Sequence, residues 1–320
     1  MASHGKHTPG PSPFDIASRA DFIIRSSDDI NFHVYKLIMS ISSPIFSDMF
    51  EVANPEPVRL GSPPELPFVC VAENSKTLDA ILRFLYPNIS YVLPQDVSLI
   101  RAVLEAARKY ELSTVRSAAV EALAKCVGTK PLPVYAIACQ YGIEDIARAA
   151  AMATTQFSPD VLWAESEYDD ELERISARML RRLVRYRQDC LNAASEGSQQ
   201  WTGPDIVKGI WCGAHKNCRA CSTTALTLPR PTGSRTYTNR YHDWWINYMS
   251  GLREKLKTEW WDEDRVRADL ISAMVESECG YMKSLHFTIC MRQVEDMVRS
   301  MSQDIRNRQA NVSLALDSFT

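Results

Sequence analysis

Glycine is scarce in this sequence, at 12 of 320 residues. That is about half of the ~7% usage typical of soluble proteins, which disfavours turn-rich all-β architectures and favours helices. Long hydrophobic runs are also missing: nowhere do about 18 apolar residues follow one another, so we expect no membrane-spanning helix and no membrane partner. Residues 1–13 lack the apolar core of a secretory signal peptide. We therefore expect an intracellular protein, in the cytoplasm, the nucleus or both.

An excess of charge of one sign is absent as well. Lys+Arg 36 stands against Asp+Glu 39, a net charge of -3. The chain as a whole therefore has no electrostatic attraction to phosphate backbones, which disfavours nucleic acid as a partner. With 45% hydrophobic and 23% charged residues, the composition is that of an ordinary globular protein, and 320 residues leave room for more than one domain.

Common enzyme signatures are missing too. The sequence contains no G-x-G-x-x-G, no P-loop, no G-x-S-x-G and no H-E-x-x-H motif. Its six histidines are scattered along the chain. We therefore expect no enzymatic activity. The alternative that stays open is a zinc-dependent enzyme built around residues 212–221, although neither an open coordination position nor a nearby acid or base is evident there.

The nine cysteines, without a secretory signal, are more consistent with buried thiols or metal ligands than with a disulfide framework. The densest group is Cys212, His215, Cys218 and Cys221, in which two residues separate each potential ligand from the next. Tetrahedral zinc binds thiolates and imidazole nitrogens, but this close spacing would require a tightly coiled loop or ligands from elsewhere. Two interpretations stay open: one structural zinc ion, or reduced structural thiols, which we favour.

The N-terminal part of the chain contains an ordered alternation of strand and helix signals. Residues 22–25 and 31–34 read as strands on either side of a polar turn at 26–29. Ser43 and Pro44 then supply a helix cap and a first-turn proline. Apolar residues follow at a spacing of four, Ile45 with Met49 and Phe46 with Phe50. This order predicts a hairpin that leads into two brief helices.

At these residues the sequence resembles a BTB/POZ domain. The family pattern is matched by Asp21, Phe22, Ile24, Phe32, Lys36, Met39, Ser43, Phe46, Met49 and Phe50. Tyr35 stands where the family has a histidine. With the helical segments that follow, the resemblance covers residues 14–127. It implies an α+β, mostly helical fold, in which a small sheet flanked by helices precedes an α-helical C-terminal region.

The resemblance also implies a homodimer with an apolar interface formed by the hairpin and the first helices. The residues implied at this interface are Phe22, Ile24, Phe32, Leu37, Phe46 and Met49. Asp21 and Lys36 match the family's charged pair near the dimer groove. Their alternative interpretation is a strand-start acid and a helix-surface lysine.

The remainder of the chain is expected to be mainly helical. We expect a disordered tail at residues 1–13, a helical extension at 128–194 and a mainly helical C-terminal region at 195–320. In the last region, apolar spacing predicts helices at 242–251, 258–276 and 286–308. Residues 68–71 read as a strand buried on both faces, and residues 227–239 as a loop. Two tryptophan pairs, at 244–245 and 260–261, cannot each face one direction, so one member of each pair should be only half buried.

One long helix is predicted at residues 164–193, with acidic residues crowding its start and arginines filling its end, as the helix dipole favours. The arginines are Arg174, Arg178, Arg181, Arg182 and Arg185. A phosphate or an acidic partner would suit this face, but a solvated helix surface is the simpler interpretation.

These observations favour an interaction protein that forms a homodimer and acts as an adaptor or scaffold for other proteins. Members of the family serve as adaptors of cullin-type ubiquitin ligases or as regulators of transcription. The sequence shows neither the forty- to fifty-residue repeats that substrate adaptors usually add nor the paired zinc fingers of the transcriptional members. A cullin is thus a partner that the resemblance implies, and a transcription-associated role is the alternative.

Overall fold

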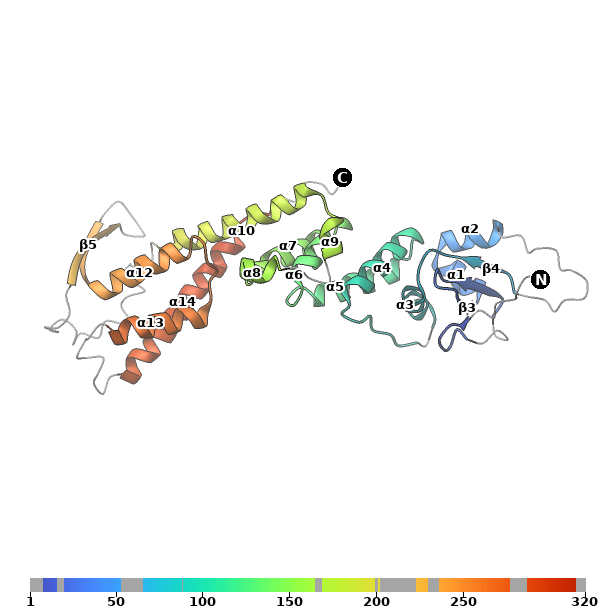
Figure 1. The fold of residues 1–320 in the computed structure, drawn as a ribbon, viewed down its shortest axis with the longest axis horizontal. Helices are drawn as coiled ribbons and strands as arrows, with labels where there is room; N and C mark the ends of the chain where they lie inside the picture. The colour runs from blue at the N-terminus through green and yellow to red at the C-terminus, as the bar shows by residue number, and fades with distance from the viewer. Residues whose placement is uncertain are drawn as a thin grey trace, which may run out of the picture. The chain divides into compact units, whose positions relative to one another are not determined.

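The structure is a computed structural model that describes residues 8–15, 20–52, 66–87, 89–164, 169–198, 201, 223–229, 236–276 and 287–314. The chain forms two compact units. The N-terminal unit comprises residues 1–147 and 166–175, and the C-terminal unit comprises residues 148–165 and 176–320. Helices predominate in both units (Figure 1), as the scarcity of glycine predicts. This division differs from the expected one, which placed residues 128–194 together.

A four-stranded sheet forms part of the N-terminal unit, with the strand order β1-β3-β2-β4. β2 (Phe22–Arg25) and β3 (Ile30–Val34) form the predicted antiparallel hairpin. The turn between them closes through the Ser26 N–H, which donates to the Ile30 carbonyl oxygen at 3.0 Å. Because side chains alternate along a strand, one face of the hairpin points into the core. Its fully buried residues are Phe22, Ile24, Phe32 and Val34.

The edge strand β1 (Thr8–Pro9) corrects the expectation that residues 1–13 form a disordered tail. β1 pairs in parallel with β3, and beside it the Gly10 N–H donates to the Asn31 carbonyl oxygen at 2.7 Å. The Arg83 guanidinium donates to the Ser12 carbonyl oxygen at 3.0 Å. Residues 8–13 are thus ordered by partners that lie far away in the sequence, and no hydrophobic pattern in the segment itself predicts them.

The opposite edge strand, β4 (Phe68–Cys70), pairs in parallel with β2. The prediction of a strand buried on both faces is wrong here, because Phe68 and Cys70 share a face that is open to solvent. Phe68 is 52% exposed, and Cys70 is exposed as well. The Arg25 guanidinium lies over the Phe68 ring, 4.4 Å from its centroid, and shields part of that ring by a cation–π contact.

Helices complete the N-terminal unit and confirm the α+β, mostly helical fold class. They are α1 (Lys36–Ser42), α2 (Pro44–Val52), α3 (Ser75–Leu85), α4 (Val97–Lys109), α5 (Ser113–Lys125), α6 (Pro131–Gln140) and α9 (Asp169–Glu173). The predicted cap at Ser43 is confirmed, since its Oγ accepts from the Phe46 N–H at 3.1 Å and donates to the Tyr110 carbonyl oxygen at 2.6 Å. The Phe46 and Tyr110 rings stack with centroids 4.5 Å apart, which fixes α2 against the end of α4.

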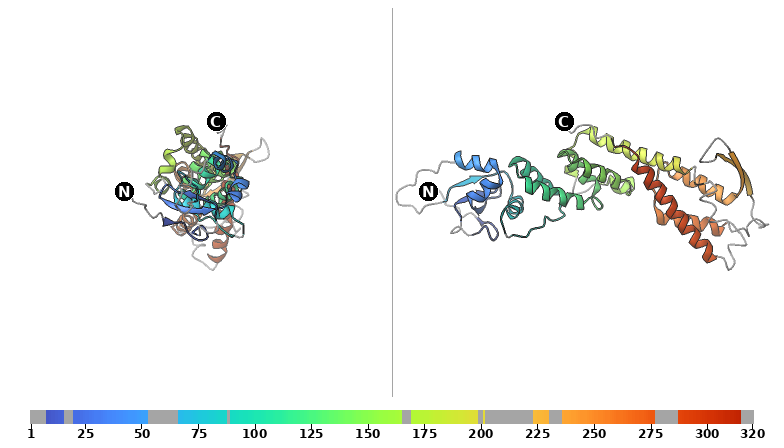
Figure 2. Two further views of the ribbon diagram at one scale, coloured as in Figure 1. Left: turned by 90° about the vertical axis from the view of Figure 1, so that its right-hand side faces the viewer. Right: turned by 180° about the vertical axis from the view of Figure 1, so that it is seen from behind.

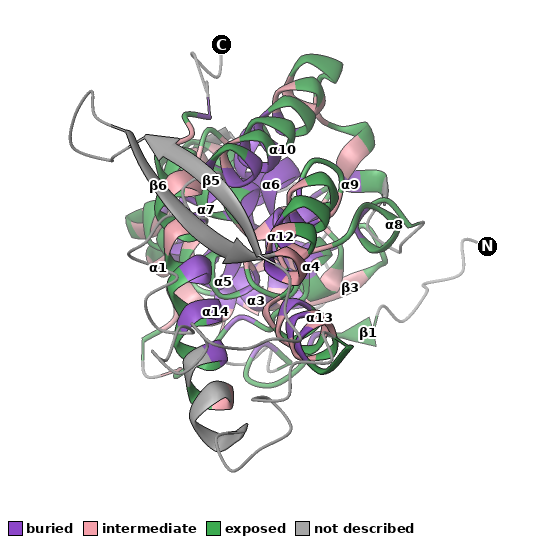
Figure 3. Cartoon of the chain, turned by 90° about the vertical axis from the view of Figure 1, so that its left-hand side faces the viewer, coloured by how far each residue is buried: buried purple, intermediate pink, exposed green. Residues whose placement is uncertain are grey.

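α6 is a buried helix within the N-terminal unit (Figure 3), because every residue from Pro131 to Cys139 is buried. A helix that is apolar all round belongs in a core. α9 packs against α6 and carries Glu171, which is 3% exposed. The Arg101 Nε of α4 lies 2.8 Å from the Glu171 Oε1. α6 and α9 are therefore integral parts of this unit.

The C-terminal unit is built mainly from long helices, and the boundary between the units falls within α7 (Glu144–Thr154). The further helices of the unit are α8 (Pro159–Leu162), α10 (Ala177–Gly197), α12 (Asp243–Lys255), α13 (Glu263–Glu276) and α14 (Phe287–Ala310). α14 packs against both α10 and α13, and α12 packs against α13 (Figures 1 and 2). The three helices predicted after residue 242 are confirmed. The tryptophan prediction is also confirmed, because Trp245 and Trp260 are buried while Trp244 and Trp261 are only partly buried.

Two predictions in the second half of the chain are wrong. In place of one helix at 164–193, α9 ends at Glu173 and α10 begins at Ala177. Ser176 caps α10, because its Oγ accepts from the Met179 N–H at 3.3 Å, so the acidic residues precede the cap. In place of a loop at 227–239, β5 (Thr223–Pro229) and β6 (Thr236–His242) form an antiparallel pair.

α10 is anchored by Arg187, a buried cation in the C-terminal unit. Its guanidinium donates to the carbonyl oxygens of Thr154 and, at 3.1 Å, of Phe157, and it lies 4.2 Å from the centroid of the Trp260 ring. Thr154 ends α7, where the helix dipole favours a positive charge. Burial lowers the pKa of Arg187 to about 10, which leaves the side chain charged at neutral pH.

Candidate functional site

Two side chains from distant parts of the sequence hold the N-terminus of α1. The Asp21 Oδ1 accepts from the Lys36 N–H at 2.8 Å, and the Tyr86 hydroxyl oxygen accepts from the Tyr35 N–H at 2.8 Å. The first N–H groups of a helix have no partner within the helix, so these two acceptors satisfy them. Burial raises the pKa of Tyr86 to about 12, so its hydroxyl stays neutral under ordinary conditions. The position of α1 is fixed in this way.

The contact between Asp21 and Lys36 runs through the Lys36 backbone N–H, so the charged pair near a dimer groove that the resemblance implies remains a prediction. The Lys36 ammonium lies over two aromatic rings, 5.0 Å from the Phe22 centroid and 5.9 Å from the Phe50 centroid. A cation at such distances is attracted by the ring faces. Asp21 therefore acts as a helix cap, and Lys36 covers the aromatic cluster under α1 and α2.

Four of the six side chains that were implied at the dimer interface lie in the core of the unit instead. Their exposure does not exceed 1%: Phe22, Ile24, Phe32 and Phe46. A side chain that is already sealed inside its own subunit cannot bury further surface against a second copy, so these four assignments are wrong. The other two residues differ, because Leu37 is 69% exposed and Met49 is partly buried.

Within the hairpin and the first two helices, the exposed apolar side chains lie at and next to α1. Tyr35 is 41% exposed, Leu37 69% and Ile41 78%. Leu37 and Ile41 are one helical turn apart and share a face; we refer to Tyr35, Leu37 and Ile41 as the α1 patch. Met39, which lies between them in the sequence, is buried. α1 is thus apolar on two faces, and this two-sided pattern is the signal by which Ile41 could have been identified from the sequence.

The possible zinc ligands Cys212, His215, Cys218 and Cys221 lie outside the residues that the structure describes. Within the described ranges, no group of three or more histidine, cysteine or acidic residues is placed to hold a metal ion. The cysteines whose surroundings are described, Cys70, Cys126, Cys139 and Cys190, take part in no disulfide. Burial raises the pKa of Cys126 and, to about 11, that of Cys190, so both stay protonated. The zinc site remains a prediction.

Comparison with known proteins identifies the larger part of the N-terminal unit. A family model of the BTB/POZ domain matches residues 14–126, and no curated protein matches the chain. In the part of the chain that is described, no helix has the length and apolar character needed to cross a bilayer. BTB/POZ domains mediate self-association and the binding of other proteins, and they are not typically catalytic. The chain therefore carries a BTB/POZ domain, a protein–protein interaction module, at residues 14–126.

Proposed function

We propose that the chain forms a homodimer through the α1 patch and serves as an adaptor or scaffold for a further protein. The observation that carries this proposal is the exposure of Leu37 and Ile41 side by side on a helix whose position is fixed by Asp21 and Tyr86. Monomeric soluble proteins seldom leave such side chains clustered in solvent without a use. In a two-fold dimer the patch of one copy meets the same patch of the other, so each of these residues contributes one buried side chain from each copy.

Burial of the α1 patch would contribute a substantial free energy to dimer formation. Complete burial of a leucine or isoleucine side chain contributes about 1.5–3 kcal/mol. Leu37 and Ile41 keep 69% and 78% of their surface exposed, so each contributes about 1–2 kcal/mol on association. Four such side chains in a symmetric dimer supply about 4–8 kcal/mol, which offsets a substantial part of the cost of joining two molecules.

Analytical ultracentrifugation of the full chain at micromolar concentration tests the proposal. The wild-type chain should sediment as a dimer. The Leu37→Glu/Ile41→Glu variant should sediment as a monomer, because its dissociation constant rises by at least about a thousandfold when some 4 kcal/mol is lost. Val92→Glu is the matched control, since Val92 is 76% exposed in the same unit and lies off α1.

Each result has a defined meaning. A wild-type chain that is monomeric at every concentration would refute self-association. A dimer that survives in the Leu37→Glu/Ile41→Glu variant would place the interface elsewhere. Equal circular dichroism spectra of the three proteins are required, and they are expected because all three positions face solvent.

For the adaptor role, we propose a cullin as the partner class to test first. Support comes from the presence of a BTB/POZ domain and a second compact unit in the same chain. A pull-down with purified cullin and the full chain tests this role directly. Failure of the folded dimer to retain cullin would leave a scaffold that joins two copies of the C-terminal unit.

A further inference from the structure

Four arginines form a stripe on α10 in the C-terminal unit. Arg178, Arg181, Arg182 and Arg185 are spaced by three and four residues. At 3.6 residues per turn, this spacing places them within about 100° of arc and along about 10 Å of the helix axis. The stripe therefore presents four positive charges to one side of α10.

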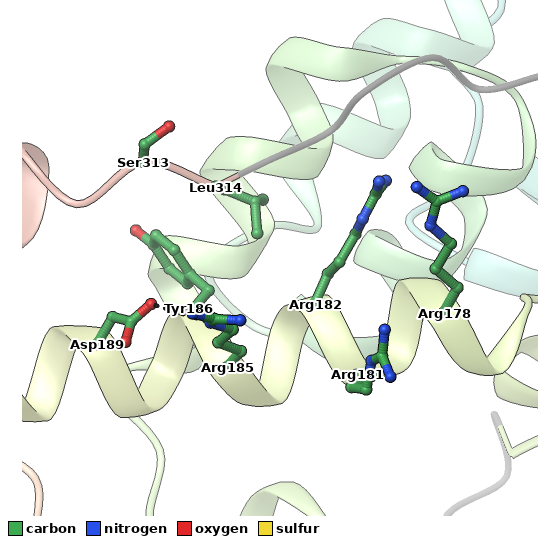
Figure 4. A pocket seen from close by; sticks show the side chains of 8 residues that line it. All are labelled: Arg178, Arg181, Arg182, Arg185, Tyr186, Asp189, Ser313 and Leu314. Carbon is green, nitrogen blue, oxygen red and sulfur yellow. Dashed lines mark ion pairs between the residues drawn. The ribbon is translucent and has the colours of Figure 1, made fainter.

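The stripe borders a pocket of about 660 Å³ (Figure 4). Tyr186 and Asp189 of α10 complete one wall, and Ser313 and Leu314 form another. That second wall is held in place, because the Arg148 Nη1 donates to the Leu314 carbonyl oxygen at 2.8 Å and Leu314 is 3% exposed. The volume is that of a site for a small molecule or a few residues of peptide. We refer to this site as the arginine pocket.

Two of the four arginines of the pocket have no carboxylate partner among the residues that the structure describes. Asp189 is the acidic side chain in its lining, and it lies 4.0 Å from Arg185, at the limit of an ion pair. Arg178 and Arg181 have no carboxylate within that distance among the described residues. Like charges four residues apart weaken a helix, as the pairs Arg178–Arg182 and Arg181–Arg185 do here. If the stripe were only a solvated helix surface, neither the repulsion between these arginines nor the pocket beside them would be needed.

We propose that the arginine pocket binds a short acidic segment of a partner protein, through carboxylate or phosphoryl oxygens. In Figure 4, Arg178 and Arg182 reach out from α10 in the same direction. Their positions are about 6 Å apart along the axis, close to the ~6.6 Å between alternate side chains of an extended peptide. Planar guanidinium groups bind such oxyanions by paired hydrogen bonds. The proposal concerns a different surface from the α1 patch and does not depend on self-association.

The same dimensions disfavour nucleic acid as the ligand. Duplex DNA carries a charge every ~1.7 Å, and proteins that bind it neutralise about six to ten phosphates. The stripe offers four arginines over about 10 Å, on a chain whose net charge is -3. A compact anion with two or three charges matches this footprint better than a long polyanion does.

Fluorescence anisotropy with the purified full chain tests the proposal. The probes are a labelled short polyglutamate peptide and a labelled peptide of matched length with two phosphoserines, and single-stranded DNA is the competing ligand. Arg178→Gln/Arg182→Gln should weaken peptide binding at least about tenfold, at roughly 0.7 kcal/mol per arginine. The matched control is Arg299→Gln/Arg306→Gln, which removes the same charge from exposed positions of α14. Arg178→Lys/Arg182→Lys should bind with intermediate affinity, because lysine keeps the charge and loses the paired geometry.

The outcomes separate a specific site from general electrostatics. Saturable binding of either peptide that is lost only in the pocket variant supports the proposal, and the tighter peptide identifies the oxyanion. An equal loss in the control variant would overturn it, as would the absence of binding to both peptides at low salt. Tighter binding of DNA through the same arginines would replace the acidic peptide by nucleic acid. The Leu37→Glu/Ile41→Glu chain should bind the peptide unchanged, so a failure of one proposal is distinguishable from a failure of the other.

Discussion

Replacing Asp21 by alanine removes the acceptor of the Lys36 N–H at the start of α1. The loss of a side-chain acceptor at a helix N-terminus costs about 0.5–2 kcal/mol of stability. Asp21 is exposed, so water replaces part of the lost interaction. We therefore expect the free energy of unfolding of the N-terminal unit to fall by about 1 kcal/mol.

Two further substitutions separate the hydrogen bond from the charge. Asp21→Asn keeps an acceptor oxygen and loses only the favourable effect of a negative charge near the helix dipole, so we expect a decrease of about 0.3–0.5 kcal/mol. Lys36→Met keeps an unbranched apolar chain over the Phe22 ring and loses a cation–π contact worth about 0.5–1 kcal/mol at an exposed site. The double variant Asp21→Ala/Lys36→Met should show the sum of the two single effects.

Urea unfolding of the full chain, followed by circular dichroism, measures these differences. The two compact units need not unfold in one step, so the transition that shifts in the Asp21 variants is the one to be compared. If Asp21→Asn destabilises as much as Asp21→Ala, the charge and not the hydrogen bond is decisive. If the double variant is no less stable than either single variant, the two side chains act as an ion pair. Either result would refute the capping role.

Two further predictions concern tyrosine hydroxyls. Tyr110→Phe removes the hydroxyl that donates to the Glu73 Oε2 at 2.6 Å but keeps the ring against Phe46, so urea unfolding should show a loss of about 2 kcal/mol; an unchanged midpoint would contradict this. Burial raises the pKa of Tyr86 from 10.0 to about 12, so the stability that it contributes is complete below pH 10 and is lost as the pH rises through 12. Between these values the stability of the wild type should therefore fall more steeply than that of Tyr86→Phe, and parallel pH profiles of unfolding would contradict the assignment.

The parts of the fold that the sequence predicts are those whose signals are local. The β2–β3 hairpin follows from alternation around a polar turn, and the cap at Ser43 follows from a serine next to a proline. The helices α12, α13 and α14 follow from apolar spacing. Each of these signals comes from residues that are close together in the sequence. The spacing of their side chains and the local backbone chemistry are enough to determine the secondary structure.

The parts that the sequence misses depend on partners that lie far away along the chain. β1 forms because two residues pair with the backbone of β3. The N-terminus of α1 is capped by Tyr86, which is 51 residues from Tyr35 in the sequence. The interface residues were misassigned for a related reason. An apolar motif has the same sequence whether its side chains pack in the core or against a second copy. Only the structure shows that Phe22 is buried while Leu37 is exposed.

The buried helix α6 and the pairing of Glu171 with Arg101 set the limits of any fragment of this protein. The recognised BTB/POZ domain ends at residue 126, yet α6 begins at Pro131, and α9 returns to the same unit some thirty residues after α6 ends. A fragment cut at residue 126 would lack α6 and leave Arg101 without its carboxylate partner. The unit that folds is therefore longer than the unit that a family pattern recognises, and a fragment designed for structural or binding studies has to retain α6 and residues 166–175.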